Sequence, residues 1–344
     1  MDWDASYALR VRAYVVDPDT WADCDELPHV TSATIDMALD KSEIQTGRMD
    51  ATVDRDTDLI DRYYRIVAET TQNGATSRTD IATMFCTSAP WTNEGGMRRA
   101  EMSLSSVLYP AANVIIPDGT FIPSGDNAVS WCSIWLKDCL KAPVTARGSF
   151  AFGSYVVFGG GMSVLDAVTY VLNAGGYRLR IGGDGSVTMC PMSDEPSITV
   201  TAAGRAFMRD GIKATNNMAS IPNRVIVTKD GVTATATNDR KSSKTSIYVR
   251  GYPREVYESN PQLLDGETLQ GYANRRLSET SVLCEERTYT RDYIGGVFVG
   301  DLILAGLQQA DLDGSMRCTK QSITCSGRIM VQETARTEEV TWEP

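Results

Sequence analysis

Apolar and polar side chains alternate with a period of two residues in several segments of this sequence, which limits the folds open to it. Between residues 6 and 17, Tyr7, Leu9, Val11 and Ala13 are interleaved with small or basic side chains. A period of two places successive side chains on opposite faces of an extended chain. The segment therefore predicts a half-buried β-strand.

Similar strand-like runs return through the first third of the chain and are rich in the Thr, Val, Ile and Tyr that strands favour. They span residues 30–39, 48–53, 62–70, 79–87 and 97–108. Asn73-Gly74 and Glu94-Gly95-Gly96 stand between runs and suit hairpin turns. Residues 1–112 are therefore predicted to form an antiparallel β-domain.

Prolines and glycines between residues 110 and 125 interrupt this pattern, and a helix is predicted after them. Ser124 or Asp126 is the expected N-cap, and Pro143 ends the helix. Its apolar side chains recur at helical spacing: Ala128, Cys132, Trp135, Leu136, Cys139 and Leu140.

A second helix is predicted after Gly159-Gly160-Gly161, with Ser163 and Asp166 in capping-box spacing and a C-terminal signal at residues 173–176. Its buried stripe is expected to be Leu165, Val168, Val171 and Leu172.

A short hairpin is expected next, from residues 177–181 through a turn at 182–185 to 186–190. Residues 113–215 are therefore predicted to form a separate α+β insert.

Strand signals resume at residues 223–227 and 232–237, around a Lys229-Asp230-Gly231 turn, and again at 245–250. A helix is predicted over 265–282, with its inward and outward faces made by Leu269, Tyr272, Ala273 and Leu277, and by Arg275, Arg276 and Glu279, respectively. Further strands are expected at 286–290, 297–304, 318–325 and 328–333 and in the terminal TEEVTW. Residues 216–344 are thus predicted as a second β-domain, interrupted by a helical segment over about 251–283.

The predicted fold class is mainly β with an α+β insert, in which two antiparallel β-barrel-like domains flank a small α+β domain. The 344 residues are 42% hydrophobic, which suits two domains or three smaller ones. The net charge of −11 argues against a general nucleic-acid-binding domain, because such a domain needs a basic face. No window has the roughly 20 apolar residues of a membrane span. The acidic start, Met-Asp-Trp-Asp, is unlike a signal peptide, so no Sec export is expected.

Few catalytic chemistries fit this sequence. His29 is the only histidine, which excludes mechanisms and metal sites that need two. It follows Pro28 and is expected at a strand edge or in a turn. The eight cysteines include no C-x-x-C pair, so reduced and packed thiols are expected. No P-loop or G-x-S-x-G motif is present. We therefore assign no catalytic, cofactor-binding or metal-binding residue and expect no enzyme activity.

One acidic run has the spacing of a calcium site. Asp54, Asp56 and Asp58 begin like an EF-hand loop, but Leu59 and Arg65 stand where that loop needs Gly and Glu. A solvated turn is therefore the favoured interpretation.

Three further patterns also have a structural interpretation that we favour. Gly159-Gly160-Gly161 before a helix can bind an anion, but a flexible approach to the helix is simpler. Cys132 and Cys139 share one helix face and are expected to pack in the core. Trp131 lies off that stripe and can cover a second surface, within the insert or against another subunit.

The order and spacing of these segments resemble the hub proteins of bacteriophage tails and baseplates. Residues 163–177 (SVLDAVTYVLNAGGY), followed by the hairpin YRLRIGGDGSVTM, resemble the insert of that family. The segment IPNRVIV at 221–227 resembles the opening strand of its second tube domain, and FVGDLI at 298–303 resembles a strand turn there. The hairpin at 322–331 resembles its last strands.

This resemblance implies a structural virion protein of the tail tip or baseplate, made in the host cytoplasm, that forms a homotrimer. Two tube-like domains per chain would give a ring that adapts a six-fold tail tube to a three-fold tip. The implied partners are the tail tube or distal tail protein, the tape measure protein, and a tail-tip fibre or spike protein. DNA would pass through the lumen without specific binding. No cofactor and no catalytic residue is implied, and because the last predicted strand ends near Pro344, no enzymatic extension is expected.

Two expectations follow for such a ring. Edge strands of residues 1–112 should pair or pack with those of 216–344 from the next chain, since free edges are normally covered. Asp and Glu should outnumber Lys and Arg on the lumen wall, because a basic wall would hold DNA phosphates.

Three other functions stay open. A distal tail adaptor or similar tail protein would form a six-fold ring. A β-rich carbohydrate-binding adhesin would bind glycans through exposed aromatic residues. A cell-wall hydrolase with a carboxylate pair would lose activity when one Asp or Glu is substituted.

Overall fold

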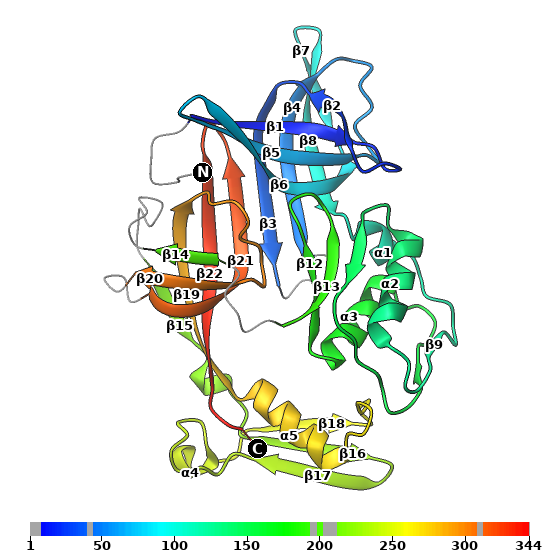
Figure 1. Cartoon of the computed structure of the whole chain (residues 1–344), viewed down its shortest axis with the longest axis vertical. Helices are drawn as coiled ribbons and strands as arrows, with labels where there is room; N and C mark the ends of the chain where they lie inside the picture. Colours follow the sequence, from blue (N-terminus) through cyan, green and yellow to red (C-terminus); the bar gives the residue numbers. More distant parts are fainter. Residues whose placement is uncertain (1–7, 40–43, 193–197, 202–211, 308–311, 344) are drawn as a thin grey trace.

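The computed structural model describes residues 8–39, 44–192, 198–201, 212–307 and 312–343 (Figure 1). Fourteen strands form one large sheet in the order β15-β19-β22-β21-β3-β4-β8-β6-β5-β1-β2, with β7 paired to β8, β20 to β21 and β14 to β20. Its first half consists of β1 (Ala8–Val16), β2 (Asp23–Leu27), β3 (Val30–Ala38), β4 (Gln45–Val53), β5 (Tyr63–Gln72), β6 (Ala75–Ser88), β7 (Trp91–Glu94) and β8 (Met97–Ser106). Its second half consists of β14 (Ile198–Thr201), β15 (Lys213–Asn216), β19 (Val282–Asp292), β20 (Leu302–Leu307), β21 (Leu312–Cys325) and β22 (Ile329–Val340).

The two halves are joined by direct strand pairing. β21 runs antiparallel to β3, with Ile323 opposite Ile35 and Cys325 opposite Ala33. All four side chains are buried. One sheet therefore continues through both strand-rich regions, although they lie at opposite ends of the chain.

The first half curls over its own inner face. In Figure 1, β1, β5 and β6 cross β3, β4 and β8 at a steep angle. Ile35, Met49, Tyr64, Ile66 and Met84 from these two layers belong to one apolar cluster, and each is at most 1% exposed. The alternation seen in the sequence thus supplies this core.

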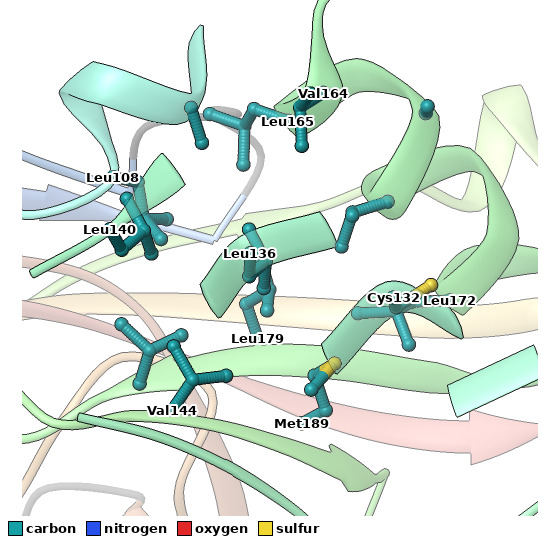
Figure 2. Packing of buried hydrophobic residues seen from close by; sticks show 14 of the residues in the cluster. Leu108, Cys132, Leu136, Leu140, Val144, Val164, Leu165, Leu172, Leu179 and Met189 are labelled. Carbon is teal, nitrogen blue, oxygen red and sulfur yellow. The ribbon is translucent and has the colours of Figure 1, made fainter. Parts of the chain in front are cut away.

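The insert lies beside the sheet and has its own core. It contains α1 (Tyr109–Asn113), β9 (Phe121–Ile122), α2 (Ala128–Cys139), β10 (Val144–Ala146), β11 (Val156–Val157), α3 (Val164–Ala174), β12 (Tyr177–Ile181) and β13 (Val187–Pro191). Helices α2 and α3 cover one face of the small sheet β10-β13-β12, where Leu136, Leu172, Leu179 and Met189 meet (Figure 2). The predicted stripe of α3 is buried, and Ser163 caps it by accepting the Asp166 amide at 3.0 Å.

A third unit lies at the foot of the sheet in Figure 1. It contains the 3-10 turn η1 (Met218–Ser220), β16 (Arg224–Lys229), β17 (Val232–Thr237), α4 (Ile247–Arg250), β18 (Glu255–Ser259) and α5 (Leu269–Thr280). Tyr272, Ala273 and Leu277 of α5 pack on Val225 and Val227 of the sheet β17-β16-β18, as the sequence predicted for this helix. On the outward side, Glu279 is exposed and pairs with both Arg275 and Arg276. The two arginines are partly buried and also pair with Glu267 and Glu258, respectively.

Three local predictions are wrong. The segment 245–250 is not a strand: Ser246 accepts the Val249 amide and Gly251 adopts φ +75°, which together close the short helix α4. The N-cap of α2 is Asn127, which accepts the Val129 amide, rather than Ser124 or Asp126. The strand predicted over 297–304 begins only at residue 302, in β20.

The prediction of a mainly β chain with an α+β insert is confirmed. The barrel-like regions are not closed barrels in the part of the chain that the structure describes, because their strands belong to one open, curled sheet. Within the same residues, no helix has the length and apolar character needed to cross a membrane.

Candidate assembly surfaces

The outer face of the large sheet is polar across six strands that span both halves. Strand register places these side chains on it: Ser32, Thr34, Asp36, Thr46, Arg48, Asp50, Thr52, Arg99, Glu101, Ser103, Ser105, Glu286, Thr288, Thr290, Asp292, Lys320, Ser322, Thr324, Gln332, Thr334 and Arg336. Ala38 and Met330 are apolar residues in the same register. None of the polar residues is buried. The face is therefore a water-facing surface of the sheet.

Charges on this outer face nearly balance. Four side chains are basic (Arg48, Arg99, Lys320, Arg336) and five are acidic (Asp36, Asp50, Glu101, Glu286, Asp292). The rest are Ser, Thr or Gln. Such a surface offers no cluster of cations to bind a phosphate backbone.

Cross-strand hydrogen bonds order the outer face. Ser322 donates to Asp36 at 2.6 Å, and this bond crosses the junction between β21 and β3. Within the second half, the Thr288 and Thr334 hydroxyls lie 3.0 Å apart. Side-chain bonds thus reinforce the backbone pairing that joins the halves.

Among the described residues, strand edges without a neighbouring strand lie at β15, β7 and β2. β15 ends the path beside β19, and all four of its residues, Lys213–Asn216, are exposed. β7 pairs only with β8, and its Trp91 is 53% exposed with Arg98 stacked 4.4 Å from the ring centroid. β2 ends the path beyond β1. Unpaired edges of this kind are surfaces that proteins normally cover.

The inner face of the second half buries an ionic cluster. Arg291 Nη2 lies 2.5 Å from Glu333 Oε2, and these side chains are 2% and 1% exposed. The Tyr289 hydroxyl and the Gln321 amide also donate to Glu333. Burial lowers the pKa of Arg291, but the Glu333 charge outweighs it, so the net pKa is raised. Burial and the same charge raise the pKa of Tyr289, so this tyrosine stays a neutral donor.

The insert touches the first half through the tip of its hairpin. Trp21 Nε1 donates to the Asp184 carbonyl at 2.8 Å, and Thr83 Oγ1 donates to the Gly183 carbonyl at 2.9 Å. A Cβ on Gly183 would lie 1.9 Å from the Asp80 carbonyl oxygen. Only glycine allows this approach.

The same hairpin holds the second half through Asp301. Arg180 donates from Nε and Nη2 to the two carboxylate oxygens of Asp301, both at 3.0 Å, and Arg178 Nη2 adds a bond at 3.3 Å. Asp301 is 1% exposed, and its carboxylate also accepts the Phe298 amide. The insert therefore bridges both halves of the sheet and fixes their relative position.

Most sequence-predicted candidates lie apart from these surfaces. His29 is exposed in the turn between β2 and β3, with φ +50°. Asp54, Asp56 and Asp58 are exposed in the loop after β4. In the glycine run, the Gly160 amide donates to the Asp118 carboxylate at 2.9 Å, so an acid of the chain itself occupies that position.

The helix candidates pack as expected. Cys132 is buried, Cys139 is partly buried, and both pack in the insert core. Burial raises the pKa of Cys132 to about 12, which keeps it a thiol. Trp131 packs against the same core and donates to Asp126 at 3.2 Å.

The sequence patterns did not predict a role for Arg178, Arg180, Asp301 or Glu333. A signal for the arginines was present, because YRLRI alternates and places both on the polar face of a strand. Nothing in the sequence pairs them with an acid more than a hundred residues away.

Solved structures share this fold. The chain superimposes on a tail protein from Neisseria meningitidis with a TM-score of 0.69 and 13% identity, over 97% of this chain and 98% of that one. A 43 kDa tail protein of prophage MuSo2 from Shewanella oneidensis gives a TM-score of 0.63 and 11% identity, over 95% and 98%. The fold is that of phage tail proteins.

A secretion-system protein has a similar fold. It is a component of the E. coli type VI secretion system, described as structurally similar to the bacteriophage T4 tail proteins gp27 and gp5. It matches with a TM-score of 0.51 and 10% identity, over 98% of this chain and 79% of that one. No protein-family model matches the chain, and no curated protein sequence does. The fold expected from the resemblance is thus confirmed.

Proposed function

We propose that this chain is a structural, non-enzymatic protein of a phage tail, the baseplate or tail-tip hub, and that it forms a homotrimeric ring through which DNA passes. The observation that carries the proposal is the pairing of β21 with β3, which joins two strand-rich halves into one sheet. Three such chains supply six strand-rich units, the number required to adapt a six-fold tail tube to a three-fold tip.

Ring closure needs two different surfaces on each chain. A three-fold ring is built from head-to-tail contacts, in which one patch of a subunit meets a different patch of the next. In the described residues, β15 ends the strand path and β7 extends from β8 outside that path, so each chain offers two different exposed edges that meet this requirement. We therefore assign ring closure to the β7 edge of one chain and the β15 edge of its neighbour.

The outer polar face is assigned to the lumen. Five acids and four bases are described on this face, so Asp and Glu outnumber Lys and Arg by only one, and it would offer no cluster of cations to hold DNA. On this assignment, the excess acid lies elsewhere on the ring. The neighbours in the tail would be the tail tube or distal tail protein, the tape measure protein and a fibre or spike protein.

Disulfide cross-linking tests the proposed closure. Asn93→Cys in β7 and Thr215→Cys in β15 are both at exposed positions, and Cys24→Ser removes the exposed native thiol. Mild oxidation of the double variant should yield a covalent trimer on a denaturing gel. A control with Asn93→Cys and Asp230→Cys, in the unit at the foot of the sheet, should stay monomeric. Equal cross-linking of both variants, or of neither, would contradict this closure.

A further inference from the structure

A cavity of about 490 Å³ opens on the polar face of the insert sheet, opposite the helices. Arg178 and Arg180 of β12 and Thr188 and Cys190 of β13 share this face, because Arg178 is opposite Cys190 and Arg180 is opposite Thr188. The remaining lining residues are Arg147, Gly148, Pro191 and Asp301. The cavity therefore belongs to the junction between the insert and the second half of the sheet.

Positive charge exceeds negative charge in this cavity. Three guanidinium groups line it, and Asp301 is the acid among its lining residues. Asp184 also acts on Arg180, where the hydrogen bond to Asp301 is the main cause of a raised pKa. Two acids thus face three arginines even when Asp184 is counted.

The hydrogen-bond donors of these guanidinium groups are not all paired among the described residues. The Arg178 side chain is only 9% exposed, and its Nε has no hydrogen-bond partner among the described residues. Its other bonds, to Asp301 and to the Val299 carbonyl, are long at 3.3 and 3.4 Å. Arg147 is exposed at the mouth of the cavity. The Arg178 Nε is out of a ligand's reach, because it is buried and its guanidinium group packs against Gly300. The exposed Arg147 is therefore the guanidinium group most open to a ligand.

We propose that this cavity binds a carboxylate side chain from an acidic peptide segment of a neighbouring tail protein. The planar guanidinium fork matches a carboxylate in two parallel bonds, and Arg180 already holds Asp301 in this way. The bound carboxylate pairs with the exposed Arg147, while Arg178 and Arg180 add positive charge to the lining of the cavity. Three arginines around one cavity suit one or two carboxylates better than DNA, which needs a row of cations along its backbone.

Fluorescence anisotropy with a labelled peptide of alternating Asp and Gly tests the proposal on the full chain. Arg147→Gln should weaken binding about ten-fold, and binding of the unaltered chain should fall as salt rises. Arg147 is chosen because its side chain is exposed, so the variant should keep the melting temperature of the unaltered chain. Arg178 and Arg180 are left in place, because they hold Asp301. Lys141→Gln, at an exposed lysine that pairs with Asp19, is the matched control and should bind as the unaltered chain does.

Competition experiments identify the chemical class of the ligand. Inorganic phosphate and a short DNA duplex are titrated against the bound peptide at matched ionic strength. Weak displacement by both supports the peptide carboxylate. Displacement by either at lower concentration than unlabelled peptide would overturn it, and so would equal binding by the Arg147→Gln and Lys141→Gln variants. The result does not depend on the trimer, because each chain carries the whole cavity.

Discussion

In the first half of the sheet the inward positions hold Ile35, Met49 and Tyr64, buried among other apolar side chains. In the second half, Arg291 and Glu333 occupy inward positions and are buried to the same degree. An apolar core tolerates volume-conserving change, whereas a buried ion pair depends on each partner. The two halves thus form one sheet and share one apolar cluster, to which the second half adds a buried ion pair.

The ionic half gains a fixed strand register from this arrangement. Glu333 is directly opposite Tyr289 on β19 and Gln321 on β21, so one carboxylate joins three neighbouring strands. A slip by one residue would turn Glu333 to the outer face and leave Arg291 buried without it. We infer that the cluster sets the register of β19, β22 and β21, the last of which pairs with β3.

Removing the acid from the ionic cluster is the largest single effect that we expect. Glu333→Ala leaves the Arg291 charge buried without its partner, and such a loss costs about 3–5 kcal/mol. Chemical denaturation of the isolated chain measures it. The double variant Arg291→Met with Glu333→Leu should lose less than Glu333→Ala alone, and an equal or greater loss would contradict the ionic account.

The matched change in the apolar half is Ile35→Ala. Ile35 is 0% exposed and lies opposite Ile323 across the junction. The cavity left behind should cost about 2–5 kcal/mol of unfolding free energy. Because no charge is stranded, this cost should not change with salt. If this loss of unfolding free energy depended strongly on salt, the apolar and ionic halves would not differ in their dependence on charge.

The unit at the foot of the sheet extends the comparison to a helix. Leu277→Ala in α5 removes a side chain that is 0% exposed between the helix and β16, and we expect a loss of about 2–5 kcal/mol. Thermal melting followed by circular dichroism measures it. Substitution of the exposed Glu279 by Ala serves as the control and should change the melting temperature little.

The smallest effect that we expect is on the melting temperature at acidic pH. Burial raises the pKa of Glu258, but the hydrogen bonds from Arg276 and Tyr272 outweigh it, so the pKa is lowered; Glu267 is lowered in the same way by Arg275. A carboxylate whose pKa is lowered in the folded state stabilises the fold at pH values above its unfolded-state pKa of about 4.3. This stabilisation is lost as the pH falls through the folded-state pKa. Melting temperatures measured down this range should fall less for Glu258→Gln than for the unaltered chain. Parallel curves would mean that Glu258 contributes nothing.

Local patterns predicted much of this fold. The alternation in residues 6–17 gives β1, and the spacing of Leu165, Val168 and Val171 gives the buried side of α3. Both features depend on neighbours within a few residues, which a sequence displays directly. The short edge strand β2 was missed, because DCDEL has only one buried apolar residue, Leu27.

The assembly surfaces were harder to predict, because they depend on contacts distant in sequence. Ser322 and Asp36 are 286 residues apart, and Arg180 and Asp301 are 121 apart. No periodicity links such pairs. The proposed boundaries at residues 112 and 215 stay predictions, since β21 and β3 pair across them.

The molar mass of the purified protein distinguishes a ring of three chains from a single chain and from a ring of six. Light scattering coupled to gel filtration should give three times the chain mass of 37.6 kDa, and this value should persist on dilution until the rings dissociate into single chains. A mass of one chain at every concentration, or six chains in a closed ring, would contradict the trimeric hub.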